Sequence, residues 1–179
     1  DDALPPLPWV NVVANETVGF IASERGSSHT WAANSRENRV TPWYNDPVSD
    51  PHGEALWVRD DDAGLFWSPL PGPVPGAGAY EVRHGFGYTR FAHEGMGIAH
   101  DVVQFVPRSG PVKLTRVRLT NTGDRPRRLS LAVYAHLVLG VFPHETRAHV
   151  VTEHDPATGA ILATNPERGE FSDRVAFAM

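Results

Sequence analysis

A chain of 179 residues with a net charge of −5 is long enough to form a single domain with a sizeable core. Its 41% hydrophobic and 21% charged residues are typical of a globular protein, and the lack of a basic run disfavours binding to nucleic acid or to an anionic membrane. The sequence has no cysteine, which excludes disulfides, thiol catalysis and cysteine-bound zinc, and no apolar run approaches the ~20 residues that span a bilayer.

Hydrophobic and polar residues alternate along most of the chain, which is typical of β-strands with one face turned to a core. Residues 127–137 illustrate the pattern, with apolar residues on one face at Leu129, Leu131, Val133, Ala135 and Leu137. The strands predicted in chain order are residues 9–14, 18–23, 55–60, 80–91, 96–106, 114–120, 127–137, 147–153, 160–165 and 173–179.

Turn-forming residues separate many of these strands. Residues 60–64, 121–126 and 155–159 each place Asp or Asn with Gly between two apolar runs, which predicts three hairpins. Because no segment favours a helix longer than a turn or two, we predict an all-β, antiparallel sandwich.

Two glycine-rich segments interrupt this regular pattern. Gly85 and Gly87 lie on either side of Phe86 within a strand-like run, which predicts a bulge or a close backbone approach. Residues 69–79, PLPGPVPGAGA, predict a loop that runs over the surface.

The titratable residues show no catalytic or metal-binding pattern. Asp60, Asp61 and Asp62 share one hairpin tip, but they lack the spaced ligands and closing Glu of a calcium loop. The nine histidines form no HxxxH or other tight pair, and no GxSxG motif positions a serine nucleophile. We therefore predict neither a metal site nor a catalytic residue.

Residues 34–50, NSRENRVTPWYNDPVSD, combine rigidity, aromatic rings and polar groups. Pro42 and Pro47 stiffen the backbone, while Trp43 and Tyr44 offer flat faces for stacking against sugar rings. The alternative, which we favour, is that the polar side chains hydrogen-bond this loop to the sandwich. They are Asn34, Arg36, Asn38, Arg39, Asn45 and Asp46.

The chain resembles the N-terminal β-sandwich of glycoside hydrolase family 94, formerly glycosyltransferase family 36, in NSRENRVTPWYNDPVSDPHGEALWVRDDDAGLFWSP and YEVRHGFGYTRF. PPLPWVNVVAN and VTEHDPATGAILATNP also fit, and the similarity points to the group of cyclic β-1,2-glucan synthases and cellobiose and chitobiose phosphorylases. The resemblance implies a galactose-mutarotase-like super-sandwich of two large twisted sheets. It also implies a longer protein, whose catalytic (α/α)6 barrel lies outside residues 1–179; the start without Met and the end within an alternating pattern suggest the same.

The resemblance further implies that the parent protein is an inverting phosphorylase or glycosyltransferase for β-glucans, with inorganic phosphate as co-substrate and no other cofactor. The domain itself is expected to be non-catalytic and to support the barrel. The expected location is cytoplasmic, on the cytoplasmic side of the inner membrane if the parent is a cyclic glucan synthase.

Family members are commonly homodimers in which a loop of the sandwich reaches the acceptor subsite of the neighbouring barrel. Here that loop corresponds to residues 164–174, so Arg168→Ala is expected to weaken acceptor use. The implied sugar-binding residues are Asn165, Glu167, Arg168 and Glu170, and the implied structural residues of the loop at 34–50 are Arg36, Asn38, Arg39, Trp43, Asn45 and Asp46.

An autonomous carbohydrate-binding module is one alternative function. It requires an exposed aromatic platform, for which Trp43 and Tyr44 are candidates. The alternating pattern around Trp57 and Trp67 predicts that these two side chains lie in the core instead.

A mutarotase-like epimerase is the other alternative. It needs a His and a Glu that converge in an open cleft. His84, His149 and Glu153 are available, but their spacing gives no sign that they converge.

Overall fold

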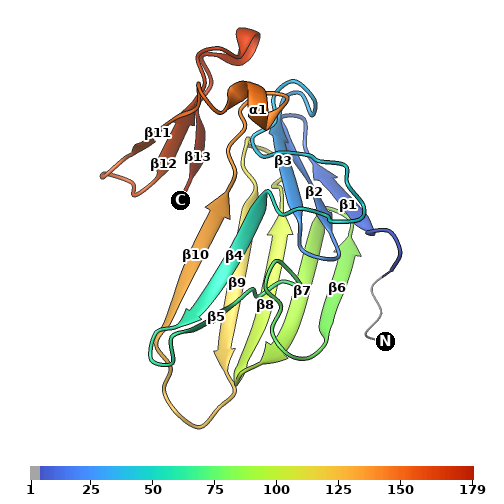
Figure 1. The fold of residues 1–179 in the computed structure, drawn as a ribbon, viewed down its shortest axis with the longest axis vertical. Helices are drawn as coiled ribbons and strands as arrows, with labels where there is room; N and C mark the ends of the chain where they lie inside the picture. The colour runs from blue at the N-terminus through green and yellow to red at the C-terminus, as the bar shows by residue number, and fades with distance from the viewer. Residues whose placement is uncertain (1–4) are drawn as a thin grey trace.

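The computed structural model describes residues 5–179, which contain thirteen strands in four antiparallel sheets (Figure 1). We name each sheet by its middle strands. The β2 sheet has β1 (Val10–Ala14), β2 (Val18–Ser23) and β3 (Ser28–Ala32); the β4 sheet has, in spatial order, β10 (Leu129–Ala135), β4 (Glu54–Asp60) and β5 (Leu65–Trp67). The β7–β8 sheet has β6 (Tyr80–Gly85), β7 (Tyr88–Gly95), β8 (Ile98–Phe105) and β9 (Leu114–Asn121); the β12 sheet has β11 (Val151–His154), β12 (Ile161–Thr164) and β13 (Ala176–Ala178). The helices are α1 (Pro143–Thr146) and η1 (Gly169–Phe171).

The β4 sheet packs on the β7–β8 sheet, and the main core lies between them, so the predicted all-β sandwich is confirmed. Alternate residues of β8 are buried, as its period of two predicts. Each buried aliphatic or aromatic side chain contributes about 1.5–3 kcal/mol to the stability of the folded state. One core cluster contains Leu56, Leu70, Phe91 and Val102, and a second contains Val58, Trp67 and Ile98.

Two turns differ from their predictions. The prediction of a hairpin at residues 121–126 is wrong, because the strands on either side of this turn do not pair with each other. β9 pairs with β8 and β10 pairs with β4, so the turn connects the two facing sheets. Of the two features expected at Gly85 and Gly87, the bulge is also wrong, whereas a close approach is present at Gly85, where the Tyr88 ring lies against the backbone. The run separates into β6 and β7, joined by a tight turn in which Gly87 has a φ of 82° that only glycine adopts without strain.

The loop at residues 69–79 does not run over the surface throughout. Leu70 is buried and belongs to the core cluster of Phe91 and Val102. The apolar side chain at the start of the loop therefore fills a space between the two sheets that the strands leave open. The Pro/Gly composition predicted an irregular backbone correctly, but it gave no sign of this one buried position.

Strand β10 extends beyond the sheet that faces it. The residues predicted on one face do share that face, since Leu129, Leu131 and Val133 pair with Asp60, Val58 and Leu56, whose side chains are buried. Leu131 and Val133 are nevertheless 48% and 70% exposed. We call this uncovered aliphatic surface the β10 overhang.

A largely buried ion pair joins the β2 sheet to the sandwich. The Lys113 ammonium, just before β9, lies 2.5 Å from the Glu54 carboxylate of β4 and 2.6 Å from the Ser28 hydroxyl of β3. Glu54 also accepts hydrogen bonds from the Thr30 and Thr41 hydroxyls at 2.6 and 2.7 Å. Burial alone would raise the pKa of Glu54, but the charge and hydrogen bonds of these partners outweigh it and lower the pKa.

The carboxylate of Asp60 organises the opposite end of the sandwich. It accepts hydrogen bonds from the backbone N–H groups of Asp62 and Ala63, which closes the β4–β5 turn. It also pairs with the Arg127 guanidinium, which in turn donates to the Met96 carbonyl in the β7–β8 turn. Asp60 is thus a structural residue that ties three turns together.

Candidate functional site

Polar side chains of the signature loop, residues 34–50, bond mainly to backbone. Asn34 accepts from the N–H groups of Arg36 and Glu37, and buried Asn38 donates to the Ala32 carbonyl at 2.8 Å. Arg39 donates to the Val141 carbonyl at 3.1 Å, which holds the loop against the chain that follows β10. A loop without regular structure is fixed in this way by its own side chains.

The second half of the signature loop is held similarly. Asp46 accepts from the Ser49 hydroxyl and from the N–H groups of Val48 and Ser49, and these bonds lower the pKa of Asp46. Asn45 adopts a φ of 50°, which asparagine tolerates well. The Trp43 ring packs against His29, with 5.7 Å between ring centroids.

The 164–174 segment is tied directly to the signature loop. Arg168 donates to the Asn38 amide oxygen at 2.9 Å and to the carbonyls of Phe171 and Arg174 at 2.7 and 2.8 Å. Buried Asn165 donates to the Leu139 carbonyl. Arg168 and Asn165 therefore use their polar groups inside the protein. Of the four residues predicted to contact sugar, Glu167 and Glu170 are the exposed ones.

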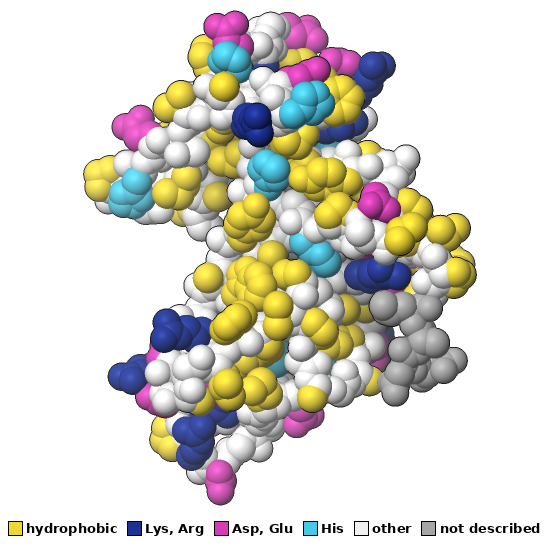
Figure 2. All heavy atoms as spheres, viewed as in Figure 1, with side chains coloured by type: hydrophobic (Ala, Val, Ile, Leu, Met, Phe, Trp, Pro, Cys, Tyr) yellow, Lys and Arg dark blue, Asp and Glu magenta, His cyan; other side chains and the backbone are white. Residues whose placement is uncertain are grey.

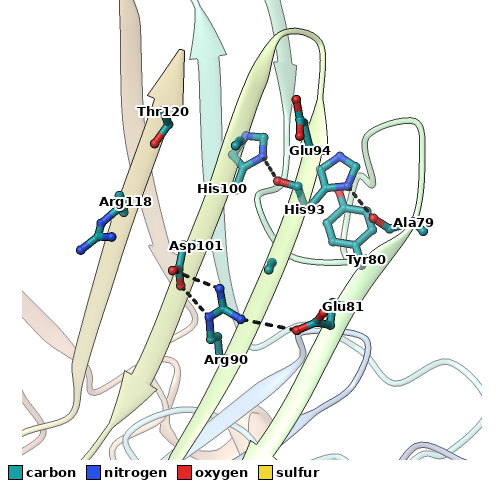
Figure 3. A pocket seen from close by; sticks show the side chains of 12 residues that line it. Ala79, Tyr80, Glu81, Arg90, His93, Glu94, His100, Asp101, Arg118 and Thr120 are labelled. Atoms are coloured by element: carbon teal, nitrogen blue, oxygen red, sulfur yellow. Dashed lines mark hydrogen bonds and ion pairs between the residues drawn. The ribbon is translucent and has the colours of Figure 1, made fainter. Parts of the chain in front are cut away.

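The outer face of the β7–β8 sheet contains a hollow of about 560 Å³ (Figure 3). Its floor includes the small side chains of Ala92 and Ala99, which leave space above two neighbouring strands. Longer polar side chains surround this floor: Glu81, Arg90, Glu94, Asp101, Arg118 and Thr120.

The charges in this hollow are largely paired. Arg90 makes two hydrogen bonds to Asp101, at 3.0 and 3.2 Å, and a third to Glu81 at 3.4 Å. These bonds from Arg90 lower the pKa of Asp101, so its carboxyl group is ionised at neutral pH. An acid for glycosidic cleavage needs the opposite shift, so Asp101 is not suited to act as a general acid.

Two buried histidines lie on the core side of the same strands. The His93 ring stacks on Tyr80 at 3.9 Å and on His100 at 5.5 Å between centroids. The Trp67 indole N–H donates to Nε2 of His100 at 2.8 Å, and burial lowers the pKa of His100. His93 and His100 are therefore packing residues of the core, and burial favours the neutral form of His100.

Two of the residues considered for an epimerase, His84 and Glu153, lie apart in the fold. His84 is on β6, where its ring bonds to Thr89 and to the Trp9 carbonyl, whereas Glu153 is on β11. Figure 1 places these two strands on opposite sides of the molecule. The structure thus offers no convergence of His84 with Glu153.

The outer face of the β4 sheet carries a row of aromatic side chains that we call the aromatic track. It consists of Phe66 on β5, Trp57 on β4, Tyr134 on β10 and Tyr44 of the signature loop. The prediction that Trp57 lies in the core is wrong, because alternation along β4 turns Val58 inward and Trp57 outward, whereas Trp67 is buried as predicted. Figure 2 shows hydrophobic side chains gathered over β4 and β10 on this side.

The described residues contain neither a metal-binding cluster nor a membrane-spanning helix. Within residues 5–179, no group of three or more His, Cys, Asp or Glu side chains is arranged to hold a metal ion. No helix in the described part of the chain has the length and apolar character needed to cross a membrane.

The chain was compared with known protein families. Residues 1–179 match the family described as "Glycosyl hydrolase 94, supersandwich domain". The chain belongs to this family. The resemblance inferred from the signature loop and the β4–β7 motifs is thereby confirmed, and with it the super-sandwich class of the fold.

Relatives of this glycosyl hydrolase 94 domain are much longer proteins. The cyclic beta-(1,2)-glucan synthase NdvB of Rhizobium meliloti (strain 1021) is 36% identical over 173 residues, which is 96% of this chain and 6% of the relative. The N,N'-diacetylchitobiose phosphorylase of Vibrio furnissii is 28% identical over 156 residues, covering 86% of this chain and 20% of the relative. A 3-O-beta-D-glucopyranosyl-beta-D-glucuronide phosphorylase of Paenibacillus borealis is 32% identical over 127 residues, 70% of this chain and 15% of the relative.

Proposed function

We propose that this domain is a non-catalytic, carbohydrate-associated part of a β-glucan phosphorylase or cyclic β-1,2-glucan synthase, where it supports the catalytic barrel and shapes the acceptor-sugar subsite. The similarity to a glucan synthase and to phosphorylases supports the enzyme class. The chain covers 6% to 20% of these relatives, which leaves ample room for a separate catalytic domain.

One observation carries the acceptor role: the hydrogen bond from Arg168 to Asn38, which joins the 164–174 segment to the signature loop. Two irregular segments become one rigid unit, because Arg168 also holds two carbonyls of its own segment. Glu167 and Glu170 project from this unit into solvent. Carboxylates fixed on a rigid loop are good acceptors for the hydroxyl groups of a sugar.

The chemistry of the parent enzyme forms part of the same proposal. The barrel supplies the general acid, and inorganic phosphate takes the place of water as the attacking group in an inverting displacement. In a homodimer, the 164–174 segment of one subunit reaches the acceptor subsite of the other barrel. The enzyme works in the cytoplasm, or at the cytoplasmic side of the inner membrane in a cyclic glucan synthase.

The first test compares this chain with a version extended through the expected barrel. Both receive β-1,2- and β-1,4-gluco-oligosaccharides with phosphate, and release of glucose 1-phosphate is measured. We expect activity in the extended protein and none in the chain alone. Activity of the chain alone would overturn the proposal.

The second test separates contact with the acceptor from positioning. In the extended enzyme, we expect Glu170→Gln and Glu167→Gln to raise the KM for the acceptor in the synthetic direction while the melting temperature stays unchanged. Arg168→Ala should raise the same KM and also lower the melting temperature, since it removes three internal hydrogen bonds. Unchanged acceptor kinetics in all three variants would refute the acceptor role.

A further inference from the structure

We propose that the aromatic track on the outer face of the β4 sheet is a second sugar-binding surface, which holds a β-linked gluco-oligosaccharide and leads it to the signature loop. The choice of a β-glucan as ligand rests on the proposed function, whereas the binding surface itself rests on geometry. This surface is separate from Glu167 and Glu170, and Tyr44 is its one residue that the sequence had already suggested for stacking against a sugar ring.

Strand register places one aromatic residue on each strand of the β4 sheet. Tyr134 pairs with Ala55 and Phe66 pairs with Arg59, so Trp57 lies midway between them along β4. The three side chains thus form a diagonal across the sheet, with steps of about 7–8 Å. The rings of Trp57 and Phe66 meet edge to face, with 5.7 Å between centroids.

The track continues from the sheet into the signature loop. The Tyr44 hydroxyl lies 3.3 Å from Nδ1 of His136, two residues after Tyr134. Burial, followed by the nearby Tyr134, raises the pKa of Tyr44, so this phenol keeps its proton and can donate a hydrogen bond at neutral pH. A ligand that follows the diagonal from Phe66 therefore reaches the loop to which Arg168 is bonded.

The residues around the track favour a sugar as the ligand over an aliphatic protein surface. Trp57 pairs with the small Ala132, which leaves the flank of the indole open. Polar groups stand beside the rings, because Arg59 carries its guanidinium on the same face and the Ser130 hydroxyl bonds to Asp61. Sugar rings need this combination, since their C–H faces stack on aromatic rings and their hydroxyls need donors and acceptors.

The opposite face of β10 provides an internal comparison. The β10 overhang is aliphatic, formed by Leu131 and Val133, and lies at an unpaired strand edge, a surface typical of packing against protein. The two faces of one strand thus differ in chemistry, and the aromatic and polar face fits a carbohydrate.

The test is an NMR titration of the 19.6 kDa chain with β-1,2- and β-1,4-linked glucotrioses. We expect saturable shift changes at Trp57, Phe66, Tyr134 and Tyr44, and a loss of affinity of about tenfold in Trp57→Ala and in Phe66→Ala. Phe66 is 59% exposed, so its replacement leaves the core intact. Phe86→Ala is the matched control, because Phe86 is fully exposed in the β6–β7 turn, away from the track.

Several outcomes would overturn this inference. One is the absence of saturable binding; another is an equal loss of affinity in Phe86→Ala and Phe66→Ala. A self-association of the chain that Phe66→Ala abolishes, without any sugar binding, would assign the track to a second copy. Binding by the chain is measured without the parent enzyme, so it can succeed where the acceptor kinetics of Glu167 and Glu170 fail, and the reverse.

Discussion

Removal of the Lys113 side chain should destabilise the domain severely. Lys113→Met leaves Glu54 in a largely buried position without its counter-charge, 2.5 Å from where the ammonium stood. Loss of one partner from a buried pair costs about 3–5 kcal/mol. The Thr30 and Thr41 hydroxyls still donate to the carboxylate and keep the cost from exceeding this range. For a domain of this size, the melting temperature should fall by roughly 6–20 °C.

Urea unfolding followed by circular dichroism measures this change, with Lys113→Met/Glu54→Gln as the comparison. The double variant buries no unpaired charge, so it should be less destabilised than Lys113→Met. The pH dependence gives a further check. In the wild type the folded pKa of Glu54 is lowered, so the pair stabilises fully at neutral pH and its contribution declines as the pH falls below about 4. A loss below 1 kcal/mol at pH 7, or a loss that grows on acidification, would refute the reasoning.

Two further predictions concern packing and solubility. Gly19→Ala should lower the free energy of unfolding by about 1–3 kcal/mol, because the new Cβ would overlap the Trp31 ring and lie 2.8 Å from the Ala14 Cβ. Gly123→Ala is the control and should leave stability unchanged, because the nearest neighbour of its new Cβ lies at 3.5 Å. Equal melting temperatures of the two variants would contradict this prediction. We expect the isolated chain to self-associate through the exposed aliphatic β10 overhang, and Val133→Lys should reduce this association in sedimentation velocity because it places a charge there. An unchanged sedimentation profile would exclude the overhang as the contact.

Local patterns predicted most of the strands, because alternation of polar and apolar residues follows directly from strand geometry. They could not predict strand partners. The turn at residues 121–126 has hairpin composition, yet it crosses between sheets, since pairing of β10 with β4 is decided by the whole core. Strand β3, SHTWA, was missed because its buried residues are largely polar and hydrogen-bonded.

In the candidate sites, too, local patterns predicted contacts between near neighbours but not contacts between distant residues. Composition suggested that polar residues of the signature loop bond to backbone, and the hydrogen bonds of Asn34, Asn38 and Asp46 have this character. The Arg168–Asn38 bond joins residues 130 positions apart, and no local pattern encodes such a partner. The aromatic track was missed because Trp57 was assigned to the wrong face of β4; the outward positions of Phe66 and Tyr134 follow once the register is known.

The Arg168–Asn38 bond also bears on the order of events during synthesis. Chains emerge from the ribosome with the N-terminal end first, so Asn38 appears long before Arg168 can reach it. Contacts between such distant positions form late in folding, because the intervening chain must first be ordered. The bond that ties the signature loop to the 164–174 segment therefore forms only after β12 has been made. A nascent chain that stalls before residue 168 would carry most of the sandwich without the finished loop.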